Sequence, residues 1–300
     1  MTRAAARPPL SRPLATAIGL AAIAMWATLG LLTAASGSVP PFQMNVLTFG
    51  LSGVLSCLWL AARGRLGAAL RQPWQVWLLG LAGLFGYHAL YFTALRNAPP
   101  VDAGLIAYLW PLLIVLFSGL LPGERLRWHH VCGAGLGFLG AVVIVTRGGG
   151  LSIDPAYALG YLAALGCAVT WSTYSVLSRR FGEAPTDAVA GFCLATAILS
   201  TPCHLAFETT VWPAEPLQWA AIVALGLLPV GAAFFVWDIG MKRGDIQILG
   251  AASYATPLAS TLVLILAGFG AFTWQVAVAA LLITLGALLA AKDMLAGRQT

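Results

Sequence analysis

The chain has 300 residues, of which 60% are hydrophobic and 9% carry a charge, and its formal net charge is +6. Soluble proteins carry about 25% charged residues, so this composition indicates an integral membrane protein and excludes an ordinary soluble one. The positive charge would suit a nucleic-acid-binding protein. Most of it, however, falls in short loops beside hydrophobic segments, where membrane orientation and anionic lipid account for it, so we expect no nucleic-acid partner.

Ten hydrophobic segments follow one another along the chain, each close to the roughly 20 residues that cross a hydrocarbon core of about 30 Å. We expect ten transmembrane helices, at residues 14–34, 41–62, 73–95, 102–121, 128–146, 156–178, 186–206, 216–238, 246–267 and 272–291.

The lysines and arginines alternate between the two sides of the membrane in a way that fits this count. With the N-terminus inside, 14 of the 16 are cytoplasmic: Arg3, Arg7, Arg12, Arg63, Arg65, Arg71, Arg125, Arg127, Arg179, Arg180, Lys242, Arg243, Lys292 and Arg298. Arg96 and Arg147 are the two outside. Because positive residues in short loops stay in the cytoplasm, the pattern predicts that both termini are cytoplasmic.

Arg3, Arg7 and Arg12 precede an apolar run, as in a secretory signal peptide. That run is about 20 residues long and nine more segments follow, so we expect a retained first span.

The chain has five cysteines without CxxC spacing, which indicates neither a disulfide framework nor a metal site.

The two halves of the sequence resemble each other. A shift of 146 residues places Tyr108 on Tyr254 and Pro111 on Pro257, so a tyrosine three residues before a proline occurs in segments four and nine. Further matches are Trp128 with Trp274, Gly140 with Gly286 and, at a shift of 145, Trp26 with Trp171 and Gly86 with Gly231.

Each half carries five segments, and an odd number makes the second half begin on the opposite side of the membrane. We therefore expect two inverted repeats, residues 1–147 and 156–300, joined by a glycine-rich linker at 148–155. Inverted repeats enclose a central cavity near the midplane in many secondary transporters that work by alternating access.

A five-segment unit with a proline in its fourth helix, Gly123-Glu124 after it and a glycine-rich fifth helix resembles the EamA unit of the drug/metabolite transporter superfamily. Two such units in tandem make the usual member. The aromatic content of the central helices is similar to that of the YddG-type exporters of aromatic amino acids. One departure is that Gly270 stands where the second unit would repeat Glu124, which favours a structural role for Glu124 in its loop over a paired gate.

Polar or aromatic side chains at midspan depth are the candidates to line a solute-binding cavity, because a polar group without a partner is costly there. We predict the substrate-binding residues to be Trp26, Tyr87, His88, Tyr91, Tyr108, Trp110, Pro111, Trp171, Ser175, Trp237, Tyr254 and Pro257. Plain helix packing is the alternative for the midspan rings. Tryptophans nearer the span ends fit an interfacial belt instead: Trp59, Trp74, Trp77, Trp128, Trp212, Trp219 and Trp274.

Pro111 affects how two of these rings are placed. Tyr108 and Trp110 lie about 200° apart on an ideal helix, so both face one cavity only if Pro111 distorts the turn. The proline also removes a backbone donor and frees the carbonyl four residues earlier, which suits a substrate contact or a hinge, with a tolerated kink as the alternative.

His88 and Asp238 each have two interpretations. His88 lies between tyrosines at midspan, where it could contact substrate or a proton, or act as a satisfied packing residue. An ionised carboxylate in a membrane is functional by default, yet Asp238 precedes Lys242 and Arg243 by four and five residues, so we favour a helical ion pair.

Glycines recur at close spacing in segment three (Gly80, Gly83, Gly86) and segment five (Gly133, Gly137, Gly140), which favours close helix packing within the bundle over dimerisation. The sequence contains no Walker A, HExxH or GxSxG motif.

Together these observations predict an all-α integral membrane protein of the bacterial inner membrane that exports small solutes by alternating access. The resemblance implies aromatic or apolar amino acids as substrates. We expect the lipid bilayer as surroundings, no enzyme activity, no catalytic residue and no metal or other cofactor; the oligomeric state stays open.

No carboxylate lies at the centre of any segment, which favours facilitated transport over tight proton coupling. The alternatives are a proton-coupled exporter of drugs or other metabolites in the same superfamily, a membrane-embedded enzyme and a non-transporting membrane protein.

Overall fold

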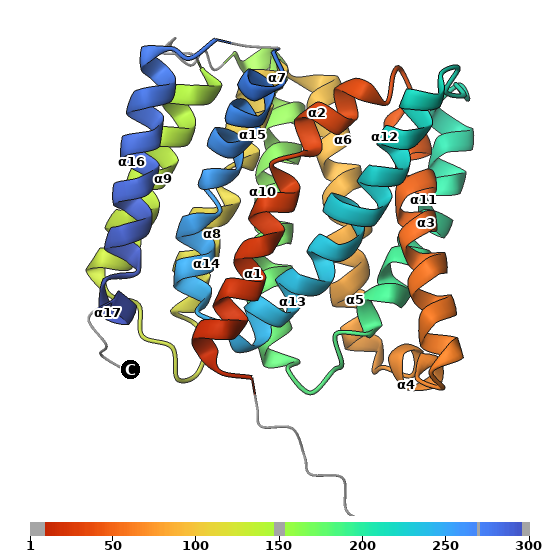
Figure 1. The fold of residues 1–300 in the computed structure, drawn as a ribbon, viewed down its shortest axis with the longest axis horizontal. Coiled ribbons are helices and arrows are strands. Elements are labelled where there is room, and N and C mark those ends of the chain that lie inside the picture. Colours follow the sequence, from red (N-terminus) through yellow and green to blue (C-terminus); the bar gives the residue numbers. More distant parts are fainter. Residues whose placement is uncertain (1–9, 147–153, 269–270, 296–300) are drawn as a thin grey trace, which may run out of the picture.

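The computed structural model describes residues 10–146, 154–268 and 271–295, and every regular element in them is a helix (Figure 1). The first part of the chain contributes α1 (Arg12–Trp26), α2 (Leu29–Ala35), α3 (Pro41–Ala62), α4 (Leu66–Leu70), α5 (Trp74–Leu81), η1 (Ala82–Gly86), α6 (Tyr87–Asn97), α7 (Pro100–Ala107), α8 (Trp110–Ser118) and α9 (Trp128–Val145). The second contributes η2 (Pro155–Tyr157), α10 (Ala158–Arg180), α11 (Ala188–Phe207), α12 (Pro216–Leu227), η3 (Leu228–Ala232), α13 (Ala233–Arg243), α14 (Ile246–Ala252), α15 (Ala255–Leu266), α16 (Trp274–Ala290) and α17 (Lys292–Leu295).

These helices begin and end within a few residues of the expected segments. Seven stretches of the described chain are long and apolar enough to cross a membrane, and α14 with α15 makes an eighth if this pair, bent by 41°, is one span. The expected all-helical, multi-pass architecture is therefore confirmed. A helix satisfies its own backbone polar groups, which is why hydrocarbon selects this structure.

Interruptions of the helices occur at matching places in the two parts. The π-helical segments η1 and η3 begin at Ala82 and Leu228, 146 residues apart, which is the offset that aligns the two halves of the sequence. A second pair of interruptions separates α7 from α8 and α14 from α15, beside Tyr108 and Tyr254. The internal resemblance of the sequence thus extends to its irregular backbone.

Ion pairs and hydrogen bonds identify which helix ends lie together. At one end of the bundle, which we call the Arg12 face, Glu124 binds both Arg12, where α1 begins, and Arg179, where α10 ends. At the other, the Glu208 face, Glu208 at the end of α11 binds the start of α3 through the amide of Phe42. Helices α1 and α10 therefore run in opposite directions, as do α3 and α11. The start of α1 and α17 lie at the same end of the molecule (Figure 1).

The most extensive packing between the two parts of the chain is made by four helix pairs: α1 with α13, α3 with α11, α6 with α10 and α9 with α16. The last pair is the closest, because Gly133 and Gly286 let the two backbones touch. A Cβ on Gly133 would stand 2.5 Å from the carbonyl oxygen of Gly286. Gly137 in turn accommodates the ring of Tyr254. The expected packing of the segment-five glycines within the bundle is confirmed.

Replacing Gly133 by alanine should destabilise the fold, because the added methyl group meets backbone that cannot move aside. We expect a loss of about 1–3 kcal/mol, typical of overpacking, seen as a lower thermal unfolding midpoint in detergent. Gly135→Ala is the matched control, since a Cβ there meets nothing within 4 Å and alanine favours helix. Equal midpoints for the two variants would contradict the proposed backbone contact.

Candidate functional site

Four tryptophans from four helices meet in the middle of the bundle: Trp26 of α1, Trp110 of α8, Trp171 of α10 and Trp237 of α13. Ring centroids lie 5.1 Å apart for Trp26 and Trp237, 5.8 Å for Trp26 and Trp171, and 6.0 Å for Trp110 and Trp237. Each residue is at most 8% exposed. Offset and edge-to-face pairs at these distances attract one another. We call this group the tryptophan cluster.

Hydrogen bonds fix two of the four indoles. The Nε1 of Trp26 donates to the carbonyl oxygen of Pro229 in η3 at 3.1 Å, and that of Trp237 donates to the Oγ of Ser175 at 3.1 Å. Ser175 is thereby a partner of Trp237 and is itself fully buried. The indole N–H groups of Trp110 and Trp171 have no hydrogen-bond partner in the described part of the chain.

Two phenylalanines that the sequence analysis did not single out complete the group. Phe234 packs against Trp26 at 6.3 Å and Trp171 at 5.8 Å, and it stacks on Phe49 at 5.7 Å. The 146-residue offset that relates Tyr108 to Tyr254 also relates His88 to Phe234. Applying the offset to each midspan candidate would have found Phe234. The same offset does not relate Phe49 to any midspan candidate, so it would not have identified Phe49.

A tyrosine wall lies on the Glu208 side of the tryptophan cluster. Tyr87 is 5.4 Å from Trp171 and stacks with Tyr91 at 6.1 Å, and Tyr108 lies close to both tyrosines. All three are half-buried, in contrast to the tryptophans. Tyr91 precedes Arg96, at the Glu208 face, by five residues, or about 7 Å along the helix. These rings therefore line the region between the cluster and that face.

His88 is held within its own helix. Its Nδ1 lies 2.6 Å from the carbonyl oxygen of Leu84 in η1, so this nitrogen carries the proton when the ring is neutral. The ring contacts Phe49 at 5.0 Å and Tyr87 at 5.2 Å. His88 thus packs among these rings, and the hydrogen bond of its Nδ1 supports the packing interpretation.

The structure shows the expected distortion at Pro111. Helix α7 ends at Ala107 and α8 begins at Trp110, so Tyr108 and Trp110 belong to different helical segments. As a result Tyr108 joins the tyrosine wall and Trp110 joins the tryptophan cluster. Pro111 lies buried in the first turn of α8, where its missing N–H costs no helical hydrogen bond.

Tyr254 and Pro257, which we expected to line the same cavity, are not brought to these rings. Tyr254 is completely buried among α8, α9 and α14, in a separate core with Phe138, and its hydroxyl accepts a hydrogen bond from the amide of Leu112 at 3.1 Å. The helix break beside Tyr108 leaves that amide in need of a partner. Pro257 is buried one turn away in the same core region.

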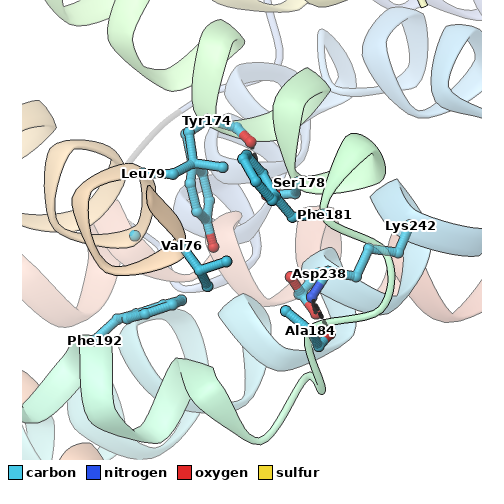
Figure 2. A pocket seen from close by; sticks show the side chains of 10 residues that line it. Val76, Leu79, Tyr174, Ser178, Phe181, Ala184, Phe192, Asp238 and Lys242 are labelled. Atoms are coloured by element: carbon cyan, nitrogen blue, oxygen red, sulfur yellow. Dashed lines mark hydrogen bonds and ion pairs between the residues drawn. The ribbon is translucent and has the colours of Figure 1, made fainter. Parts of the chain in front are cut away.

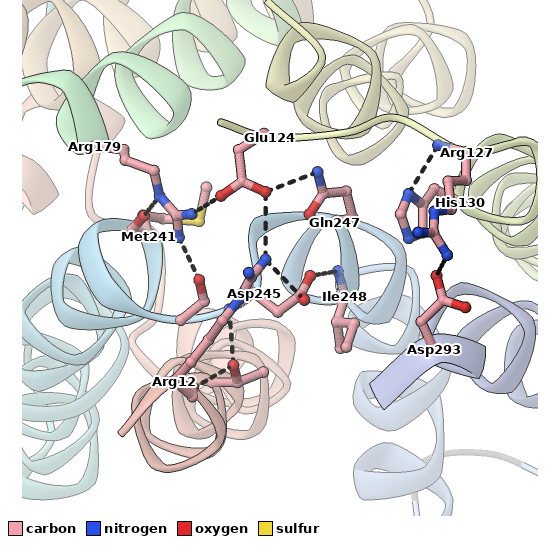
Figure 3. A network of polar contacts seen from close by, with 12 residues as sticks. Arg12, Glu124, Arg127, His130, Arg179, Met241, Asp245, Gln247, Ile248 and Asp293 are labelled. Atoms are coloured by element: carbon pink, nitrogen blue, oxygen red, sulfur yellow. Dashed lines mark hydrogen bonds and ion pairs between the residues drawn. The ribbon is translucent and has the colours of Figure 1, made fainter. Parts of the chain in front are cut away.

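A charged network closes the Arg12 face (Figure 3). The carboxylate of Glu124 binds Arg12 at 3.3 Å, the amide of Gln247 at 3.2 Å, and Arg179. Arg12 also pairs with Asp245 at 3.1 Å. Our expectation that Glu124 has a structural role in its loop was too narrow, because its long side chain reaches helices from both parts of the chain.

Arg179 is the hub of this network. Besides Glu124 it donates to the carbonyl oxygens of Met241, at 2.8 Å, and Gly244. These carbonyl groups lie at the end of α13, where no later N–H group of the helix is available to bond them. One guanidinium therefore ties α10 to α13 and to the loop before α9.

Asp238 forms the expected ion pair with Lys242, Oδ2 to Nζ at 2.9 Å, and accepts a further hydrogen bond from Thr186 at 2.6 Å. Lys242 also donates to the carbonyl oxygen of Ala184 at 2.9 Å. The pair borders a small cavity beneath Tyr174 (Figure 2). Arg243, the other partner considered, is exposed.

His129, His130 and Asp293 are the one set of side chains in the described chain whose donor atoms could hold a metal, lying within 4.8 Å of one another. Asp293 is, however, bound to Arg127 at 2.6 Å and to His129 at 3.0 Å. Burial raises the pKa of the Asp293 carboxyl, but Arg127 and His129 lower it by more, so its pKa lies below the usual value. The Asp293 carboxylate is therefore already paired with Arg127 and needs no metal ion to balance its charge.

Three proteins illustrate what this chain is similar to. The aromatic amino acid exporter YddG of Ancylobacter novellus is 56% identical over 282 residues, which cover 94% of this chain and 98% of that protein. The YddG exporter of Salmonella typhimurium is 27% identical, covering 82% and 86%. A probable terminal-alkyne amino-acid exporter of Streptantibioticus cattleyicolor is 28% identical, covering 84% and 85%.

A solved crystal structure that is 55% identical superposes with a TM-score of 0.90, covering 96% of this chain and all of that one. The model of the EamA-like transporter family matches twice, at residues 14–146 and 158–292. The chain therefore belongs to the EamA-like transporter family and is a membrane transporter of small solutes rather than an enzyme.

Proposed function

We propose that this protein exports aromatic amino acids across the bacterial inner membrane by alternating access. The observation that carries the proposal is the ring assembly at the centre of the bundle, where a buried tryptophan cluster adjoins three half-buried tyrosines. Flat apolar surfaces of this kind bind an aromatic side chain by offset and edge-to-face contacts. The names of the YddG relatives agree with this substrate class.

The proposed architecture has ten membrane spans in two inverted five-helix units, residues 1–147 and 156–300, with a linker at 148–155. The opposite directions of α1 and α10 and of α3 and α11 support the inversion, and the matching positions of η1 and η3 support the two units. Beyond the apolar stretches already counted, α10, with 23 residues, and α16, with 17, supply the remaining spans. Most of the linker lies outside the described residues.

The Arg12 face is proposed to be cytoplasmic, which places both termini inside. Arg12, Arg179 and Lys242 lie at this face, whereas Arg96 lies at the Glu208 face with its partner Glu208. This distribution agrees with the rule that positive residues remain on the cytoplasmic side.

In the state described, two layers separate the tyrosine wall from the Arg12 face. The tryptophan cluster is the first layer, and the network around Glu124 and Arg179, nearer the Arg12 face, is the second. The tyrosines of the wall, in contrast, retain accessible surface. This arrangement fits a conformation closed to the cytoplasm. Transport then requires a second conformation in which the network separates and the wall closes.

Within this proposal, Trp26, Trp110, Trp171 and Trp237 with Tyr87, Tyr91 and Tyr108 form the substrate chamber, and His88 and Ser175 hold rings in place. The free indole N–H groups of Trp110 and Trp171 are suited to the substrate carboxylate. Pro111 contributes by separating Tyr108 from Trp110. Tyr254 and Pro257 act on the chamber through the packing of α8 against α14.

No carboxylate lies among the residues of the ring assembly, so we propose that the protein moves neutral zwitterions down their own gradient. A proton-coupled exporter of another metabolite is the second candidate, and it would need an acidic group that takes part in the cycle.

Replacing Trp171 by alanine should weaken substrate binding about tenfold, because one stacking partner worth about 1–1.5 kcal/mol is lost. The measurement is counterflow of labelled phenylalanine in proteoliposomes, with gel filtration to confirm folding. Trp171→Phe keeps a ring and should retain most of the affinity. Trp128→Ala is the control, since Trp128 is 64% exposed at a span end. If Trp171→Ala and Trp128→Ala exchange equally fast, the chamber is assigned wrongly.

Transport of phenylalanine should proceed at the same rate with and without a pH gradient across the proteoliposome membrane. A neutral zwitterion moving alone carries no net charge or proton. The measurement is initial uptake at equal and at unequal internal and external pH. A strict requirement for the gradient would favour the proton-coupled candidate instead.

Replacing Glu124 by glutamine removes the charge that joins Arg12 to Arg179 and should favour the conformation open at the Arg12 face. A shift in population raises apparent affinity for substrate offered at that face and lowers it at the other. We expect several-fold changes of opposite sign in half-saturation, measured in vesicles of the two orientations. Glu183→Gln is the matched control, an exposed carboxylate at the same face. Identical effects of the two variants would rule out a gating role for the network.

A further inference from the structure

The ion pair of Asp238 and Lys242 is unusual in its position. It lies in α13, within the apolar stretch Pro216–Arg243, and the side chains of Asp238 and Lys242 are only 3% and 9% exposed. Thr186 and Ala184, from the segment that links α10 to α11, complete the hydrogen bonds of the pair. Such groups are costly in a membrane protein and usually mark a path for a solute or an ion.

The cavity beside this pair has aromatic and aliphatic walls. Tyr174, Phe181 and Phe192 supply the rings, Val76 and Leu79 supply aliphatic groups beside them, and Asp238 and Lys242 stand at one end (Figure 2). It offers about 10 Å³ to water-sized molecules, roughly what a single water requires. An aromatic side chain does not fit until the walls separate.

The chemistry of this cavity complements one class of solute. An amino acid carries an ammonium and a carboxylate on one carbon, and the cavity presents a carboxylate and an ammonium 2.9 Å apart. We propose that the cavity is a second amino-acid site, on the Arg12 side of the tryptophan cluster. There Lys242 binds the substrate carboxylate and Asp238 its ammonium group, while the substrate ring enters between Phe192 and Tyr174. This inference rests on the proposed export of aromatic amino acids.

Binding at this site creates no unpaired charge. Without substrate, Asp238 and Lys242 neutralise each other; with substrate, each pairs with the opposite charge of the zwitterion. Removing one partner of a buried pair leaves the other uncompensated, whereas an exchange of partners does not. Opening requires Lys242 to leave the carbonyl of Ala184, so the segment between α10 and α11 is the wall that moves.

A continuous row of rings connects this cavity to the central chamber. Tyr174, which lines the cavity, is 5.3 Å from Trp171, and Trp171 is 5.4 Å from Tyr87 in the tyrosine wall. Trp237 of the tryptophan cluster directly precedes Asp238. A substrate captured at the Arg12 face therefore has ring surfaces to follow toward the Glu208 face.

The test uses substrates that lack one charge, offered to inside-out vesicles so that the Arg12 face meets the medium. The parent protein should prefer phenylalanine over phenethylamine, which has no carboxylate, and over 3-phenylpropionate, which has no ammonium group. Lys242→Gln should reduce the preference over phenethylamine at least about tenfold, and Asp238→Asn the preference over 3-phenylpropionate by a similar factor, because each loses one charge-assisted hydrogen bond.

Arg243→Gln is the matched control, because Arg243 is the exposed neighbour of Lys242 at the same helix end, and it should leave both preferences unchanged. If a single variant fails to fold, the double variant Asp238→Asn with Lys242→Gln removes both charges and leaves none unpaired. It should lose both preferences together.

Unchanged preferences in a folded variant would overturn the inference and leave the pair as a structural contact. In that case the parent and the Trp171 variants would still behave as proposed for the central chamber. If the parent protein transports no aromatic amino acid at all, the proposed function is wrong, and this inference is wrong with it.

Discussion

Inside hydrocarbon every backbone N–H and C=O must find its partner within the protein, so helices are continuous except where another group supplies the missing bond. Three exceptions in the described residues lie beside aromatic rings. Trp26 donates to the carbonyl of Pro229 in η3, His88 bonds the carbonyl of Leu84 in η1, and Tyr254 accepts from the amide of Leu112 after the α7–α8 break. Aromatic side chains thus complete the backbone at these three irregular positions.

The two faces of the molecule are held by different interactions, although its helices follow a repeated plan. At the Glu208 face one buried carboxylate accepts the amides of Phe42 and Gln43 at the start of α3 and pairs with Arg96. A carboxylate is favoured there by the helix dipole as well as by hydrogen bonds. That contact joins α3 and α6 of the first part to α11 of the second.

At the Arg12 face Glu124 and Arg179 likewise connect groups from both parts of the chain. The aligned position in the second part is Gly270, so this carboxylate occurs once. Glu124 is thus a contact between the two parts of the chain that the repeat does not reproduce.

The ring assembly combines apolar aromatic surfaces with the two indole N–H groups of Trp110 and Trp171, which have no partner in the described residues. It contains no carboxylate among those residues. Asp238 and Lys242, two charged residues of α13, form a mutually neutral pair on the Arg12 side of the rings.

Sequence alone determined the membrane class, the positions of the helices, the internal repeat and the ion pair of Asp238 with Lys242. These follow from local properties: runs of apolar residues, the spacing of charges, and contacts four residues apart on one helix. It also identified Tyr87, Trp110 and Trp171 as midspan rings, because depth can be counted along a span.

Which of those rings meet was decided only by the tertiary structure. Tyr254 aligns with Tyr108 in the repeat, yet it is buried in another core, while Phe49 and Phe234 join the tryptophan cluster. Glu124 finds Arg179 55 positions away. The rotation of a helix about its axis and the choice of its neighbour depend on close backbone contacts such as Gly133 with Gly286, and these are set by the packing of the whole bundle rather than by any pattern within one helix.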